Sequence, residues 1–104
     1  MRRSTTIKLI NFLVSLRRLP PLSELSGEEE RLLFELHEIW ETKGDLSVSD
    51  VYELGGGKSA STAYRNLVSL KDKGLVDVAI DDGDKRKRNV TFTKSAKQLF
   101  AAMA

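Results

Sequence analysis

Residues 59–92 read SASTAYRNLVSLKDKGLVDVAIDDGDKRKRNVTF, and this stretch decides the fold. Ser59 is a good N-cap and Gly74 a good C-terminal stop, so a helix is predicted between them. Apolar residues recur at helical spacing and predict a buried stripe of Ala63, Leu67 and Leu70. The polar residues between them are expected to face outward from this helix.

Two short segments of alternating apolar residues follow the helix and predict a β-hairpin. The first strand would carry Val76, Val78 and Ile80, and the second Val90 and Phe92. Asp82-Gly83 between them is a strong signal for a tight hairpin turn. The basic run at residues 85–88 would then lie at the hairpin tip, where Asp84 is expected to pair with Arg86 or Arg88 and orient it.

Upstream of this stretch, a capping box predicts the start of a longer helix. Ser26 would be its N-cap and Glu29 the reciprocal partner, and three successive glutamates suit the positive end of the helix dipole. Gly44 is a good C-terminal cap. The spacing of the apolar residues predicts a core-facing stripe of Leu32, Leu33, Leu36, Ile39 and Trp40.

A second capping box, Ser47 with Asp50, predicts a short helix that continues to Leu54. Leu46 before it is a candidate for a short strand. Three glycines at 55–57 predict the turn that leads into the helix after Ser59. Two helices joined by a glycine turn and followed by a hairpin are thus expected in succession.

Both ends of the chain are predicted to add a helix. Ser4 would cap an apolar helix over residues 4–18, which Pro20-Pro21 stops, and residues 19–25 form a connector. Thr93 would cap the last helix, which carries Ala96, Leu99, Phe100 and Met103. The first helix is too apolar to be fully solvated. It would pack on a partner subunit or lie on a membrane surface, and the small core of the rest favours the partner subunit.

These elements define the predicted fold class. The chain is expected to be mainly α with a small β-hairpin wing (α+β), a winged helix-turn-helix with a three-helix core plus N- and C-terminal helices. Two parts are expected: residues 1–21 as a probable dimerisation arm and residues 22–104 as a DNA-binding domain.

The distribution of charge supports a nucleic-acid partner more than the net charge of +2 does. Residues 1–18 hold five basic and no acidic residues, residues 19–54 are net −8, and residues 55–104 are net +5. A basic face could meet phosphates while the acidic segment points away. The candidate DNA-binding residues are Lys58, Ser59, Ser61, Thr62, Tyr64, Arg65, Lys85, Arg86, Lys87 and Arg88.

Each group of these candidates has a distinct expected role. Ser61, Thr62, Tyr64 and Arg65 would face out near the helix start and enter the major groove. Lys58 and Ser59 would hold a phosphate at the helix N-terminus. The four cations of residues 85–88 would form a wing on the minor groove or the backbone. The alternatives are a solvated helix that binds protein and a hairpin rim that serves solubility.

Residues 45–100 resemble the winged-helix core of MarR-type transcription regulators. The matching segments are LSVSD at 46–50, STAYRNL at 61–67, LKDKGLV at 70–76, DKRKR at 84–88 and VTFT at 90–93. The resemblance implies a homodimer, binding to a palindromic operator and, often, repression. The chain departs from the family in ending near Ala104, where the long C-terminal dimerisation helix would be truncated, and no small-molecule effector is expected.

Other chemistries find little support. Gly55 to Ser59 resembles a phosphate loop, but Tyr52 stands where its first glycine is needed and a helix precedes it. The chain has no cysteine and one histidine, so no zinc site is expected, and His37 is interpreted as a structural boundary residue or, less readily, a pH switch. Asp81 to Asp84 lack calcium-loop spacing. Trp40 is assigned to the core.

The functional hypothesis is therefore a DNA-binding protein that is not an enzyme, needs no cofactor and is cytoplasmic. Its most favoured role is transcription regulation in a prokaryote, phage or plasmid. Two alternatives stay open: a winged-helix protein-protein interaction module, and a plasmid or phage replication or partition factor. Steep salt dependence would separate DNA binding from the first of these.

Overall fold

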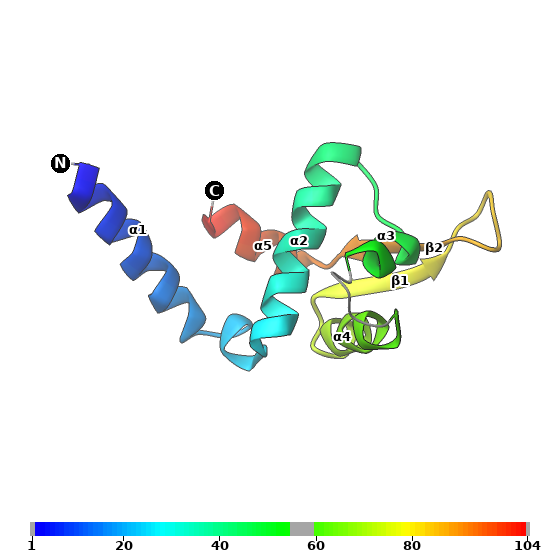
Figure 1. The fold of residues 1–104 in the computed structure, drawn as a ribbon, viewed down its shortest axis with the longest axis horizontal. Coiled ribbons are helices and arrows are strands. Elements are labelled where there is room, and N and C mark those ends of the chain that lie inside the picture. Colours follow the sequence, from blue (N-terminus) through cyan, green and yellow to red (C-terminus); the bar gives the residue numbers. More distant parts are fainter. Residues whose placement is uncertain (1, 55–59, 104) are drawn as a thin grey trace.

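The computed structural model describes residues 2–54 and 60–103. The elements follow the predicted order (Figure 1): α1 (Arg2–Arg17), the 3-10 turn η1 (Leu22–Glu24), α2 (Gly27–Lys43), α3 (Val48–Glu53), α4 (Ala60–Asp72), β1 (Val76–Ile80), β2 (Arg88–Phe92) and α5 (Lys94–Met103). The architecture is mainly helical with one two-stranded antiparallel sheet, as the sequence predicts.

The molecule is elongated, with extents of 51 × 25 × 23 Å. In Figure 1, α1 projects from one end of the long axis and the loop between β1 and β2 projects from the other. Helix α2 crosses the middle, with α5 on the side of α1 and with α3 and α4 on the side of the hairpin. The basic hairpin tip and the apolar N-terminal helix are therefore far apart.

One hydrophobic core joins α2, α3, α4, α5 and the hairpin. The predicted stripes are buried in α2 (Leu32, Leu33, Leu36) and in α4 (Ala63, Leu67, Leu70). Two residues of the predicted α2 stripe are less buried than expected, since Ile39 is half-buried and Trp40 is 41% exposed. On the first strand, Ile80 is 64% exposed. Ile80 is exposed because it ends β1, where the hairpin leaves the body.

The predicted capping interactions of α2 are present. Ser26 Oγ accepts from the Glu29 N–H at 3.1 Å, and Glu29 Oε1 accepts from the Ser26 N–H at 2.7 Å. Gly44 ends the helix with φ of 82°, a left-handed conformation that glycine adopts without steric cost. The sequence alone was sufficient to place both ends of this helix.

The helix ends elsewhere agree with the sequence in most places. The Ser47 N–H donates to Asp50 Oδ2 at 2.9 Å, as its capping box requires. Thr93 Oγ1 accepts from the Ala96 N–H at 3.3 Å at the start of α5. The prediction for Ser4 is wrong, because α1 already begins at Arg2 and Ser4 lies inside it.

The predicted strand at Leu46 is reduced to a single contact with the hairpin. Ser47 forms an isolated antiparallel bridge with Asn89, and the Leu46 carbonyl accepts from the Val90 N–H at 3.0 Å. This contact fixes the segment before α3 to β2. The predicted connector contains the short η1 turn, which buries Leu22 and which the sequence reading left without structure.

Candidate nucleic-acid interface

The outer face of α4 is the first part of the candidate interface. Because Ala63, Leu67 and Leu70 point into the core, the residues on the opposite side of the helix face solvent. Ser61 and Arg65 are one turn apart on this side, and both side chains are exposed. An arginine here can reach beyond the surface of the domain, which is the geometry that groove contact requires.

The neighbours of Arg65 are less open than the sequence suggests. Tyr64 is half-buried and packs against the core, so the prediction that it faces fully outward is wrong. Its ring lies 6.4 Å from that of Tyr52, centroid to centroid. Thr62 is also half-buried and lines a groove on the side of α4 that faces α2, rather than the outermost surface. The open face of α4 is therefore narrower than predicted.

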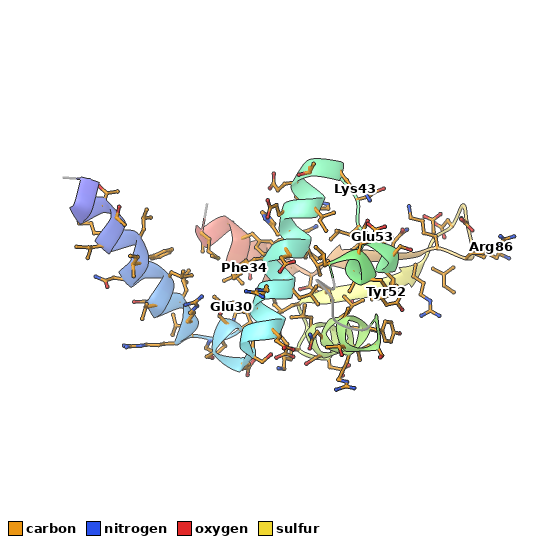
Figure 2. The ribbon with its side chains drawn as sticks, viewed as in Figure 1. Glu30, Phe34, Lys43, Tyr52, Glu53 and Arg86 are labelled. Carbon is orange, nitrogen blue, oxygen red and sulfur yellow. The ribbon has the colours of Figure 1, made fainter. Side chains whose placement is uncertain are left out.

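Tyr52 is a surface residue that the sequence reading did not select. It lies on α3, with 44% of its surface exposed (Figure 2). Val48 and Val51 are buried at i, i+3 spacing, and this helical spacing of two valines in the sequence could have indicated that Tyr52 faces away from the core. The Tyr52–Tyr64 pair places two phenol rings beside the exposed part of α4.

The hairpin turn differs from the predicted tight turn at Asp82-Gly83. The strands pair as far as Ile80 with Arg88, and the Asp81 N–H donates to the Lys87 carbonyl at 2.9 Å. Positive φ is found at Gly44 and Gly74 but not at Gly83, whereas the favoured two-residue turns need it. The hairpin therefore ends in a longer loop.

The side chain of Asp81 organises this loop. Its Oδ2 accepts hydrogen bonds from the N–H groups of Gly83 at 3.1 Å and Asp84 at 2.9 Å. Its Oδ1 accepts from Asn89 Nδ2 at 2.8 Å. The hydrogen bond from Asn89, together with those from the loop backbone, outweighs desolvation and holds the pKa of Asp81 below its usual value.

The predicted ion pair of Asp84 is also corrected. Asp84 Oδ1 accepts from the backbone N–H of Arg86 at 3.0 Å, so the carboxylate caps the loop backbone instead of a guanidinium. Lys87 Nζ lies 3.9 Å from Asp45 on the loop before α3. Within the described parts of the chain, no carboxylate lies within ion-pair distance of Lys85, Arg86 or Arg88. Figure 2 shows Arg86 at the far tip, directed away from the body.

Two predicted phosphate-binding residues cannot be placed. Lys58 and Ser59 lie outside the described residues, as does the glycine turn at 55–57. Of the predicted site residues that are described, Ser61, Arg65 and the four cations of residues 85–88 are exposed. They come from α4, from the loop that follows β1 and from the first residue of β2.

The described residues contain neither a metal-binding cluster nor a helix able to span a membrane. Over residues 2–54 and 60–103, no group of three His, Asp or Glu side chains is arranged to hold a metal ion. His37 is half-buried at the boundary of α2 and α5, with its ring centroid 4.1 Å from that of Phe100 and Nε2 3.4 Å from Glu41 Oε1. In the same part of the chain, no helix is long and apolar enough to cross a bilayer.

A groove of about 640 Å³ lies behind α4, between α2 and α3. Its floor is apolar and includes Leu32, Val51 and Ala63, and its rim carries Arg31 and Glu35. The two rim residues form an ion pair with 3.9 Å between Nε and Oε1. The sequence reading expected no effector pocket and did not indicate this groove.

No protein-family model matches the chain, and neither does any curated protein sequence. Solved structures do match. The S. aureus MepR–DNA complex has a TM-score of 0.63 and 19% identity, over 95% of this chain and 82% of that chain. A MarR-like transcriptional regulator from Thermotoga maritima has a TM-score of 0.65 and 21% identity, over 93% of this chain and 71% of that chain.

A third similar structure is BpsR of Bordetella bronchiseptica, whose DNA binding is regulated by 6-hydroxynicotinic acid. Its TM-score is 0.59 and its identity 25%, over 98% of this chain and 66% of that chain. Likeness at these identities concerns the fold.

Proposed function

Because the chain has a MarR-like winged-helix fold, we propose that it binds double-stranded DNA and regulates transcription. One observation carries the proposal. Three cations of the wing, Lys85, Arg86 and Arg88, are exposed and have no carboxylate within ion-pair distance in the described chain. Cations left without protein partners at a projecting tip are suited to neutralise phosphates and release counterions.

The proposed contacts divide between the two elements. The exposed side of α4, with Arg65 and Ser61, would enter the major groove, and a guanidinium there can bond a guanine in bidentate fashion. Thr62 and Tyr64 would contact the groove edge from their half-buried positions. Lys58 and Ser59, just before α4, are proposed to hold a phosphate.

The wing would lie on the adjacent backbone or minor groove. Arg86 and Arg88 would supply the main contacts, because Lys87 lies close to Asp45. Lys85 would add a further phosphate contact. Contacts of this kind position a protein on DNA without reading its sequence.

A homodimer is part of the proposal. Five apolar residues of α1 are between 39% and 64% exposed: Ile7, Leu9, Ile10, Phe12 and Val14. They lie around most of the helix, and this much exposed apolar surface usually marks an interaction site. We assign residues 1–21 to dimerisation with a second copy, which would place two α4 helices about 34 Å apart to read a palindrome.

The test is a fluorescence-anisotropy titration of a random-sequence duplex across salt concentrations. If about six phosphates are neutralised, the affinity of the parent should fall roughly 10³-fold between 50 and 200 mM salt. The Arg86→Ala/Arg88→Ala double variant should bind more weakly and with a shallower salt slope.

A matched control makes the same change in net charge elsewhere. Lys94 is exposed at the start of α5, outside both α4 and the hairpin. The Lys94→Glu variant, which also lowers the net charge by two, should bind like the parent. If the parent does not bind even at low salt, the DNA hypothesis is wrong and the surface serves another partner.

A further inference from the structure

A side-chain hydrogen bond within the hairpin closes the base of the wing loop. Asn89 on β2 donates from Nδ2 to Asp81 Oδ1 at 2.8 Å, across the base of the loop. Asn89 also forms the bridge to Ser47, directly before α3. Through its other oxygen, Asp81 holds the N–H groups of Gly83 and Asp84.

We propose that Asp81 and Asn89 are positioning residues that hold the basic wing in the orientation that DNA binding requires. The inference rests on the proposed function, and it assigns to this pair a role without direct contact to DNA. The contacts form a continuous path from the bridge at Ser47 through Asn89 and Asp81 to the loop that carries Arg86.

The physical reason is the entropy of the loop. Residues 82–86 lie beyond the last hydrogen bond between the two strands, from the Asp81 N–H to the Lys87 carbonyl. The second half of the loop is closed by a backbone turn, in which the Lys87 N–H donates to the Asp84 carbonyl at 2.9 Å, and the first half has the Asp81 carboxylate as its partner. A loop that is free to move must be ordered when its cations meet phosphates, and this ordering lowers the affinity. The carboxylate of Asp81 fixes the first part of the loop before binding, and Asn89 fixes the carboxylate.

The sign of the charge makes this inference testable. Asp81 is an anion beside a surface proposed to bind an anion, so its charge alone would weaken DNA binding. Replacing it would then tighten binding if the residue had no positioning role. If it positions the wing, replacing it should weaken binding instead. A residue with a positioning role and one without it therefore predict opposite changes in DNA affinity when Asp81 is replaced.

Asp82 provides the matched control. It is exposed, lies next to Asp81 and forms no hydrogen bond or ion pair with any residue that the structure describes. Asp81→Ala and Asp82→Ala remove the same charge. At about 100 mM salt, Asp81→Ala should bind a random-sequence duplex roughly tenfold more weakly than the parent, with a salt slope reduced by about one. Asp82→Ala should bind as tightly as the parent or more tightly.

Asn89→Ala removes the other partner of the hydrogen bond without a change of charge. Thr91→Ala is its control, because Thr91 is exposed on the same strand. Asn89→Ala should also weaken binding several-fold and flatten the salt slope, whereas Thr91→Ala should do neither. The thermal unfolding midpoint of each variant shows whether it is folded at the assay temperature.

A double-mutant cycle separates positioning from a general effect on the fold. In the Arg86→Ala/Arg88→Ala background, Asn89→Ala should have little further effect, because the cations that it positions are gone. A loss of affinity that is equal in both backgrounds would overturn the inference, as would Asp81→Ala binding as tightly as Asp82→Ala. In both cases the parent still binds DNA, so the proposed function stands. If the parent does not bind DNA at all, both the proposed function and the positioning role are wrong.

Discussion

Lys73 Nζ lies 2.7 Å from Oε1 of Glu29 and so joins the end of α4 to the first turn of α2, across 44 positions of sequence. Glu29 is only 5% exposed, and it also accepts hydrogen bonds from the Ser69 hydroxyl and the Ser26 N–H. Lys73 in turn donates to the Glu24 carbonyl at 2.8 Å. This network fixes α4 relative to α2.

Replacing Glu29 should destabilise the protein. Glu29→Gln would leave Lys73 without its anionic partner and lower the free energy of unfolding by roughly 2–3 kcal/mol. This loss is smaller than is usual for a broken buried ion pair, because the Lys73 side chain keeps some contact with water. Glu38→Gln, on the exposed face of the same helix, should change it by less than about 0.5 kcal/mol. Urea unfolding followed by circular dichroism measures both, and equal midpoints for the two variants would contradict the prediction.

The same carboxylate should make stability depend on pH. Burial raises the pKa of Glu29, but hydrogen bonds from Lys73, Ser26 and Ser69 outweigh it and lower the pKa from 4.5 to about 2. Because the folded pKa is depressed, the stabilisation is complete above about pH 4.5 and is lost as the pH falls towards 2. The difference in unfolding free energy between the parent and Glu29→Gln should shrink as the pH falls from about 4.5 towards 2. A constant difference over this range would show that Glu29 does not titrate as described.

Arg65→Ala should weaken binding to a preferred DNA site by about 1–3 kcal/mol and relax the base preference at one position, if Arg65 bonds a guanine. Lys94→Ala is the control, since Lys94 is exposed at the start of α5 and is not among the proposed contacts. A preferred site selected from randomised duplexes, followed by titration of single-base variants, measures both effects. Unchanged preference in Arg65→Ala would remove this residue from the base-reading role.

Arg88→Ala should act differently, because a wing contact to phosphate carries no sequence information. Affinity for all sequences should fall by about the same factor, and the slope of log K against log salt should decrease by about one. Titrations of preferred and random duplexes at several salt concentrations test this. A loss confined to the preferred duplex would instead assign Arg88 to base reading.

Phe12→Glu should shift the protein from dimer to monomer. Phe12 is 46% exposed on the apolar surface of α1, and a buried carboxylate without a partner would be costly in an interface. Asn11→Glu adds the same charge on an exposed position of the same helix and tests whether charge alone dissociates the dimer. Sedimentation equilibrium over a range of concentrations gives the mass. A monomeric parent at high concentration would eliminate the dimer model.

Local relations in the sequence were enough to define the elements of this protein. The capping box of Ser26 with Glu29 and the spacing of Ala63, Leu67 and Leu70 involve residues within one or two helical turns of one another, so helix geometry alone predicts them. The sequence also showed directly that residues 85–88 are all basic and that they follow a predicted strand.

Only the tertiary structure decided which residues meet across the chain. The partner of Glu29 is Lys73, and the half-burial of Tyr64 follows from packing that its own helix does not reveal. At the hairpin, the carboxylate of Asp81 bonds Asn89 and the loop backbone, so a longer loop replaces the tight turn that Asp82-Gly83 suggested. Contacts between separate elements depend on how those elements pack, and neither residue spacing nor propensity encodes that packing locally.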